Sequence, residues 1–233
     1  MYQIRNIIIP LQKQLDLFKL LSYKLHIPVS DIENIEILRC SLDARQKNHL
    51  KYNLTLKAEI SQKIALNNDV QIYEEPQPYL NVSEKLSDLH PYIIGSGPAG
   101  LFAALALVEK GLQPYIFERG DNLKNRSEKV KILRQKGILD EESNVQFGEG
   151  GAGTFSDGKL TSRKSDYYTN RVTDYLIRFG ANAEIKYEAL PHLGTDGLRN
   201  IVTNLRAYLE EKGCRFFWNH KLENFEFSDG KIK

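Results

Sequence analysis

Three glycines near the middle of the chain have the spacing of a turn that binds phosphates. They stand in the segment Tyr92-Ile-Ile-Gly-Ser-Gly-Pro-Ala-Gly100, after a short apolar run. In a G-x-G-x-x-G turn, the first glycine permits a tight turn, the second lets the backbone approach a pyrophosphate, and the third lets the helix pack close to the strand. We therefore expect a dinucleotide site that includes Gly95, Ser96, Gly97, Pro98, Ala99 and Gly100.

This motif is weak evidence without its structural context, and here the sequence predicts that context. Tyr92–Ile94 is predicted to be a strand, and residues 98–110 a helix whose first N–H groups and positive dipole end point at the phosphates. Gly111 follows where a left-handed residue ends a helix. The next predicted strand, residues 113–117, leads into Glu118, whose carboxylate could accept hydrogen bonds from both ribose hydroxyls.

The turn and the acid serve the same ADP half in FAD and in NAD, so the motif alone does not distinguish the two cofactors. Gly95-Ser-Gly-Pro-Ala-Gly-Leu101 with Glu118-Arg119 resembles the flavin-type fingerprint of the glutathione-reductase-like superfamily. More specifically, the chain resembles a family of uncharacterised bacterial FAD-dependent dehydrogenases, also called NAD(FAD)-utilizing dehydrogenases. The matching segments are Glu118-Arg-Gly120 with Arg126, Ser143-Asn-Val-Gln-Phe-Gly-Glu-Gly-Gly-Ala-Gly-Thr-Phe-Ser-Asp-Gly-Lys159 and Pro191-His-Leu-Gly-Thr-Asp196.

The resemblance runs from about residue 91 to the end of the chain. It is weaker before that point, where Ser41-Leu-Asp-Ala-Arg45 is the best match. It implies FAD as the cofactor and a longer FAD-dependent oxidoreductase of which this chain is the N-terminal part. It also implies that the strand of residues 216–225 lies beside the adenine and offers it backbone hydrogen bonds near Leu222. NAD(P)H is a candidate electron donor for this protein, although the sequence contains only one dinucleotide fingerprint.

The glycine-rich segment is the most specific part of the resemblance, and it has a physical interpretation of its own. Glycines leave the backbone without side-chain bulk, so it can approach a flat ring or a diphosphate and present N–H groups to it. Phe147 and Phe155 bracket the glycines and could anchor the segment, whereas the alternative is a flexible surface loop. The predicted cofactor site therefore also includes Gly150, Gly151, Ala152 and Gly153.

Several charged residues near these motifs have two interpretations. Arg119 and Arg126 could place guanidinium groups near the pyrophosphate or adenosine, or could be solvated. Asp157 and Lys159 fit a turn better than a role beside the flavin. His192 is predicted to be a loop histidine rather than a catalytic base. A helix is expected to follow it, and Thr195 or Asp196 could cap that helix. No catalytic residue and no metal site is assigned.

The expected fold class is α/β: an incomplete FAD/NAD(P)-binding Rossmann-like domain preceded by a small α+β domain that is ferredoxin-like. In the first domain, residues 1–80, we expect a strand at 4–9, a helix at 11–26 and strands at 35–42 and 52–60. The charged stretch 41–47 is read as a solvated connection rather than a functional patch. Residues 81–90 are the expected linker, and 91–233 the nucleotide-binding domain, which stops inside a hairpin.

Composition narrows the possible functions. The 233 residues are 41% hydrophobic and 27% charged, with a net charge of +2 that gives no broad field for nucleic acid. No signal or membrane segment is apparent, so we expect a cytoplasmic protein. Cys40 and Cys214 stand far apart, which does not indicate a disulfide, a zinc site or a redox dithiol. Two alternatives to an FAD-dependent oxidoreductase stay open: an NAD-binding dehydrogenase, and a truncated, non-catalytic dinucleotide-binding or interaction module.

Overall fold

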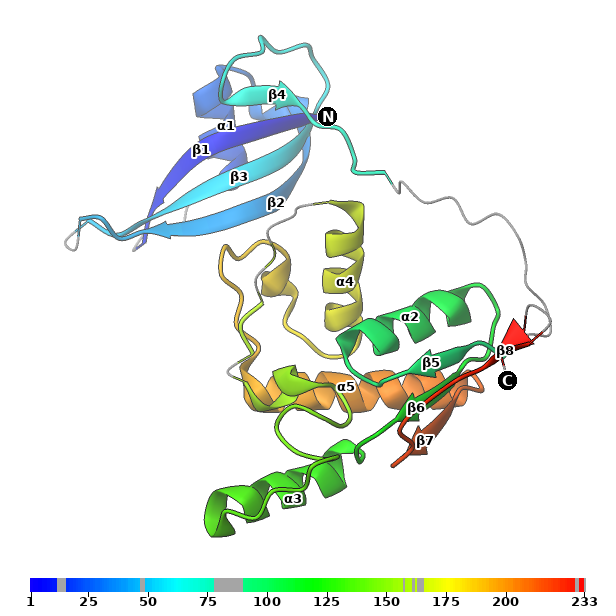
Figure 1. Ribbon diagram of the computed structural model, residues 1–233. Coiled ribbons are helices and arrows are strands. Elements are labelled where there is room, and N and C mark those ends of the chain that lie inside the picture. Colours follow the sequence, from blue (N-terminus) through cyan, green and yellow to red (C-terminus); the bar gives the residue numbers. More distant parts are fainter. Residues whose placement is uncertain are drawn as a thin grey trace. The chain divides into compact units, whose positions relative to one another are not determined.

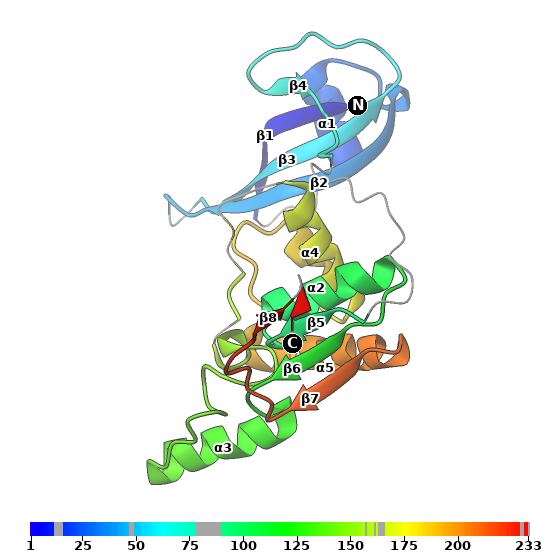
Figure 2. The same cartoon turned by 45° about the vertical axis from the view of Figure 1, so that its right-hand side comes forward.

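The computed structural model describes residues 1–11, 16–46, 49–77, 90–156, 158–160, 162, 166–228 and 231–232 (Figures 1 and 2). The chain divides into two compact units. The first comprises Met1–Tyr79, Thr161–Thr173 and Ala183–Pro191, and the second comprises Leu80–Leu160, Asp174–Asn182 and His192–Lys233. The expected linker of residues 81–90 lies, except for His90, outside the described residues.

The division differs from the contiguous domains expected from the sequence, because two later segments belong to the first unit. For the segment Ala183–Pro191, the contact lies at Cys40, in the strand β2 (Ile32–Asp43). Its N–H donates to the carbonyl of Tyr187 at 2.7 Å, and its carbonyl accepts from the N–H of Ala189 at 3.0 Å. Such a long-range pairing leaves no signal in the local sequence pattern.

The first unit is built on an antiparallel sheet with the strand order β2-β3-β1-β4. The strands are β1 (Tyr2–Pro10), β2, β3 (Lys51–Ile60) and β4 (Val70–Ile72), and β4 was not expected from the sequence. Helix α1 (Leu17–Leu25) and a 3₁₀ turn (Val29–Asp31) connect β1 to β2. Because β3 pairs with both β1 and β2, the three expected strands form one sheet (Figure 1).

Helix α1 starts later than the sequence indicated, and residues 12–15 lie outside the described part of the chain. Asp16 caps it, since its carboxylate accepts from the N–H groups of Phe18 and Lys19. His26, with φ of 55°, ends it. Leu21 packs with the buried face of the sheet, and buried residues alternate with partly exposed ones along the centre of β3. The buried core of this unit is Ile4, Ile7, Leu21, Ile32, Leu54, Leu56, Ala58 and Val70.

The second unit contains a parallel sheet with the order β5-β6-β7. Its strands are β5 (Tyr92–Ile94), β6 (Tyr115–Glu118) and β7 (Arg215–Trp218). Helix α2 (Pro98–Glu109) connects β5 to β6, as the sequence predicted. The connection from β6 to β7 carries α3 (Leu123–Lys136), a 3₁₀ turn at Ala152–Phe155, α4 (Tyr167–Arg178), a 3₁₀ turn at Ala183–Lys186 and α5 (Gly194–Glu211). Helix α3 was not expected.

The expected strand 216–225 is shorter in the structure. Strand β7 ends at Trp218, and Asn219 takes a left-handed conformation with φ of 58° that turns the chain away. Two short strands follow, β8 (Phe227–Ser228) and β9 (Lys231–Ile232), which pair antiparallel, while residues 229–230 lie outside the described part.

The two faces of the parallel sheet differ in character. Ile93 and Ile116 are neighbours in the register, Ile116 is buried, and Ile93 lies close to Gly100 of α2. Figures 1 and 2 show α2 and α5 running along this side of the sheet. On the opposite side, aromatic rings contact one another across the strands, some stacked and some edge to face: Tyr92, Tyr115, Phe117 and Phe217.

Candidate functional site

The glycine turn connects the end of β5 to the start of α2. The N–H of Gly95 donates to the carbonyl of Phe117 at 2.7 Å, and Gly95 has a φ of 95° that favours glycine. A Cβ atom on Gly100 would lie 1.9 Å from the carbonyl oxygen of Gly95. The helix therefore approaches the turn as closely as the third glycine of the motif allows.

Gly97 differs from Gly100, because a side chain added at Gly97 would contact almost no other atoms. A Cβ atom there would have one close neighbour, the Cα atom of Gly151 at 3.9 Å. The helix α2 begins at Pro98, so the N–H groups of its first turn precede the helical hydrogen-bond ladder. The backbone of Gly97 thus lies close to that of Gly151, and neither residue has a side chain.

Glu118 is buried at the end of β6, with a relative exposure of 5%. Its Oε2 atom accepts from the N–H and the hydroxyl of Ser96, at 2.8 and 2.9 Å. Its Oε1 atom accepts from the N–H groups of Gly120 and Gly148, at 2.9 and 3.1 Å. The carboxylate therefore connects the glycine turn to the glycine-rich segment, and four donors already use its lone pairs.

A pocket of about 340 Å³ opens beside Glu118 at the carboxyl ends of the parallel strands. Six of the residues assigned from the sequence line it: Gly95, Gly97, Glu118, Arg119, Gly151 and Leu222. The sequence did not assign its other lining residues, which are Ile94, Phe117, Gln146, Phe147, Gly148, His220 and Lys221. The assigned residues that do not line it are Ser96, Pro98, Ala99, Gly100, Arg126, Gly150, Ala152 and Gly153.

The glycine-rich segment lies directly against the turn and the end of β6. The N–H of Gly150 donates to the carbonyl of Ser96 at 2.9 Å, and a Cβ atom on Gly151 would lie 3.1 Å from Cδ of Pro98. A Cβ atom on Gly120 would lie 2.7 Å from the Cα atom of Gly148. These contacts hold Gly148 and Gly151 in the pocket wall and do not fit a loosely attached surface loop.

Arg126 lies fully buried in α3, so the expectation of a solvated side chain is wrong, while a place near the pyrophosphate or adenosine stays a prediction. Its guanidinium group is neither solvated nor in the pocket wall, because it donates to backbone carbonyls of the glycine-rich segment. Burial lowers the pKa of Arg126 to about 10, and the nearby Glu118 and Glu149 favour its charged form. The side chain stays charged at neutral pH and acts through the segment.

Glu149 is a buried carboxyl group within the glycine-rich segment itself. Its Oε1 atom accepts from Nε of Arg206 in α5 at 2.7 Å, and its Oε2 atom accepts from the N–H of Leu123 at 2.6 Å. Burial raises the pKa of Glu149, against the effect of these two donors. The pair joins the glycine-rich segment to α5.

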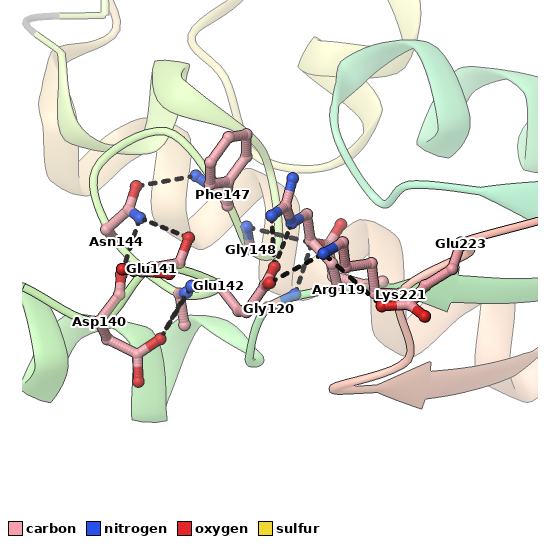
Figure 3. Close-up of polar contacts among 12 residues, drawn as sticks. Arg119, Gly120, Asp140, Glu141, Glu142, Asn144, Phe147, Gly148, Lys221 and Glu223 are labelled. Atoms are coloured by element: carbon pink, nitrogen blue, oxygen red, sulfur yellow. Dashed lines mark hydrogen bonds and ion pairs between the residues drawn. The ribbon is translucent and has the colours of Figure 1, made fainter.

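Arg119 and Lys221 stand at the pocket wall and share one exposed carboxylate (Figure 3). Arg119 bonds to Oε2 of Glu142, and Lys221 lies 3.3 Å from Oε1. The guanidinium of Arg119 also lies over the ring of Phe147, 4.0 Å from its centroid. Arg119 lowers the pKa of Glu142.

Of the other residues considered in the sequence, Leu222 lines the pocket, whereas Lys159 and His192 do not. Leu222 lines it with an exposed side chain. Lys159 and His192 form an isolated antiparallel bridge, and Asp157 lies outside the described residues. The expected cap of α5 is not formed: the helix starts after Leu193 without a side-chain cap, and the hydroxyl of Thr195 donates to the carbonyl of Ser156.

Among the described residues, no group of three or more His, Cys, Asp and Glu side chains is arranged to hold a metal ion. Among the described helices, none combines the length and apolar character required to cross a membrane. Cys40 is partly buried and Cys214 is buried, and both are free thiols. Burial raises the pKa of Cys214 to about 11.

Two comparisons place the chain among known sequences. Residues 1–59 match the family model described as "Domain of unknown function (DUF8436)". An uncharacterized protein of Clostridium beijerinckii is 38% identical over 239 residues, which cover 99% of this chain and 45% of that protein. The chain thus spans less than half the length of this relative. Neither description specifies a cofactor or a reaction, and the family match ends before the pocket residues.

Proposed function

We propose that the second unit binds FAD through its ADP half, as the cofactor-binding part of a cytoplasmic FAD-dependent oxidoreductase with a Rossmann-like nucleotide fold. The observation that carries this proposal is the pair of glycines in the pocket wall, Gly97 and Gly151. Neither residue has a side chain, and the two backbones lie close together, since a Cβ atom on Gly97 would lie 3.9 Å from the Cα atom of Gly151. A diphosphate can approach the backbone at such a place.

The size and chemistry of the pocket fit one part of a dinucleotide. Ligand pockets have volumes of about 300–1,000 Å³, and this one, at about 340 Å³, suits the ADP half rather than a whole FAD molecule. The first-turn N–H groups of α2 would receive the phosphates, because the helix begins at Pro98 beside the pocket. Glu118 would accept a ribose hydroxyl, in competition with the hydroxyl of Ser96.

The choice of FAD over NAD rests on the resemblance to the flavin-type fingerprint. When bound, FAD supplies hydride or electron transfer through its isoalloxazine ring, and the protein supplies position and electrostatics. The residues of this chain would bind and orient the ADP half and keep the adjoining backbone close to it. NAD(P)H is the proposed electron donor. An ADP site of this form would also serve an NAD-binding dehydrogenase or a non-catalytic binding module.

The first experiment identifies the cofactor directly. The purified chain is denatured, and the released material is analysed by visible spectroscopy and chromatography. Stoichiometric FAD is the expected result. Recovery of NAD instead would favour the NAD-binding dehydrogenase. If nothing is released, added FAD and ADP are titrated against the folded chain, and failure of both to bind would overturn the proposal.

A substitution at Gly97 tests the proposed site in the folded protein. Gly97 has ordinary extended dihedrals, with φ of −71°, so alanine adds only a methyl group between the two glycines. We expect Gly97→Ala to weaken FAD binding by at least tenfold and to leave the melting temperature nearly unchanged. Gly197→Ala is the matched control, because a Cβ atom there meets only Leu193 at 4.0 Å. Equal affinity in both variants would argue against a ligand beside Gly97.

A further inference from the structure

The guanidinium group of Arg126 forms hydrogen bonds with several backbone carbonyls of the glycine-rich segment. Nε donates to the carbonyl of Asn144 at 2.8 Å, and Nη2 donates to that of Val145 at 3.0 Å. Nη1 lies 2.6 Å from the carbonyl oxygen of Glu149 and 2.9 Å from that of Gly151. The carbonyl of Gly148 lies 3.3 Å from the same Nη1 atom, so five carbonyls between residues 144 and 151 share a single guanidinium group.

The stem and the plane of the same side chain make further close contacts. A Cβ atom on Gly148 would lie 2.5 Å from Cδ of Arg126, so a side chain at that position would collide with the arginine stem. The ring centroid of Phe155 lies 4.7 Å from Cζ of Arg126 and 4.5 Å from Cζ of Arg199. Nη1 also donates to the hydroxyl of Thr154 at 2.9 Å.

This arrangement fixes the direction of the peptide groups in the pocket wall. With its carbonyls turned to Arg126, the segment directs N–H groups to the opposite side: that of Gly148 to Glu118, that of Glu149 to Asp121, and that of Gly150 to Ser96. Ser96 belongs to the glycine turn, Glu118 ends β6, and Asp121 follows β6. The N–H groups of Gly148, Glu149 and Gly150 therefore all have acceptors within the protein.

We propose that Arg126 is a positioning residue, which shapes the wall at Gly148 and Gly151 before any ligand arrives. This inference deepens the proposed function and rests on it only for the identity of the ligand. A preformed wall reduces the loss of conformational entropy on binding, because the backbone is already ordered. Arg126 contacts no ligand in this role, and its effect on affinity passes through the carbonyls that it holds.

Lysine cannot replace arginine in this position. A guanidinium group has five donors in a rigid plane, whereas an ammonium group is a compact charge with three donors on a flexible stem. Arg126→Lys keeps the charge but leaves buried carbonyls without donors, so the segment should loosen while the sheet stays folded. Arg206→Lys is the matched control, because Arg206 also reaches this segment, through the side chain of Glu149 rather than through its carbonyls.

The decisive measurement is hydrogen exchange of the ligand-free chain, resolved by peptide. In Arg126→Lys, we expect the amides of residues 148–151 to exchange at least tenfold faster, with β5 and β6 unchanged. Arg206→Lys should leave the exchange of these amides within about threefold of the unsubstituted chain. Unchanged exchange at residues 148–151 in Arg126→Lys would overturn the proposal, as would a uniform loss of protection throughout the second unit.

A titration with FAD separates this inference from the proposed function. If the unsubstituted chain binds FAD, Arg126→Lys should bind it at least tenfold more weakly, with the melting temperature much less affected, and equal affinity would overturn the positioning role. If the unsubstituted chain binds neither FAD nor ADP, the proposed function fails, and the hydrogen-exchange result still decides whether Arg126 orders the segment.

Discussion

Ser96 donates two hydrogen bonds to the same oxygen of Glu118, from its backbone N–H at 2.8 Å and from its hydroxyl at 2.9 Å. The hydroxyl can rotate, whereas the N–H is fixed by the turn. A ribose hydroxyl that approaches Oε2 would therefore compete with one donor of Ser96 and not with the other.

Replacement of Ser96 by alanine removes this competitor. We expect Ser96→Ala to bind the dinucleotide about fivefold more tightly, since one hydrogen bond is worth about 1 kcal/mol. Isothermal titration with FAD or ADP measures the change. Weaker binding would mean that the serine hydroxyl contacts the ligand itself.

Replacement of Glu118 by glutamine tests how far the carboxylate holds the site together. The amide oxygen can replace only one carboxylate oxygen, so buried N–H groups of Ser96, or of Gly120 and Gly148, lose their acceptor. Each unsatisfied buried donor costs about 1–3 kcal/mol, and we expect a clear loss of stability in urea unfolding. Glu142→Gln, at an exposed carboxylate, is the control and should change little. Equal unfolding midpoints for the two variants would contradict this role of Glu118.

Gly100→Ala should disrupt the second unit without reference to any ligand. Its Cβ atom would lie 1.9 Å from the backbone oxygen of Gly95, and neither backbone can yield easily. Overpacking of this kind costs about 1–3 kcal/mol or more, so the melting temperature should fall by several degrees. Gly197→Ala, inside α5, should stabilise slightly because alanine favours a helix. A Gly100→Ala protein as stable as the parent would show that the turn can shift.

Lys24 supports an irregularity in the first unit. The register between β1 and β3 shifts between Ile4 and Ile7, where Asn6 has a φ of 56°. Nζ of Lys24 donates to the carbonyl of Arg5 at 2.8 Å and lies 2.9 Å from Oδ2 of Asp69.

Lys24→Met removes these bonds, and we expect a loss of about 1–2 kcal/mol in the unfolding of the first unit. Calorimetry can measure this loss, and hydrogen exchange can assign it to the first unit. Lys19→Met, at an exposed residue on the same helix, serves as the reference and should have no effect on this scale. Similar stability of both variants would mean that the irregular strand needs no support from α1.

The pH dependence should reveal the ion pairs of Lys129. This lysine lies 2.8 Å from Oδ2 of Asp140 and 2.7 Å from Oδ2 of Asp121. The hydrogen bond from Lys129 holds the pKa of Asp140 below its ordinary value, against a smaller effect of burial. The carboxylate thus stabilises the fold above the unfolded pKa of about 3.9, and this contribution is lost as the pH falls through the lower folded pKa.

We expect Lys129→Met to weaken this acid dependence in urea titrations between pH 5 and pH 3. Lys131→Met, on the same helix, should retain it. An identical pH profile for Lys129→Met and the parent would show that other carboxylates account for the acid sensitivity.

The order of strands and helices around the glycine turn could be read from the sequence, because each step is local. Gly95, Gly97 and Gly100 encode the turn, Pro98 begins the helix, and β6 ends at Glu118. Helix α3 escaped prediction because its sequence is largely polar and only Leu123, Arg126 and Val130 are buried. The three-residue strand β4 is too short to leave a pattern.

The sequence by itself determined which stretches of backbone have no side chain to keep a phosphate away, since glycine lacks a Cβ atom in any fold. Only the tertiary structure decided the roles of the charged side chains, because burial and partners are set by residues far apart in the chain. Arginine is a residue type that often binds anionic ligands, yet the guanidinium of Arg126 donates to backbone carbonyls that lie between residues 144 and 151. Glu118 ends the predicted strand, yet the N–H of Gly148, thirty residues away, shares its carboxylate.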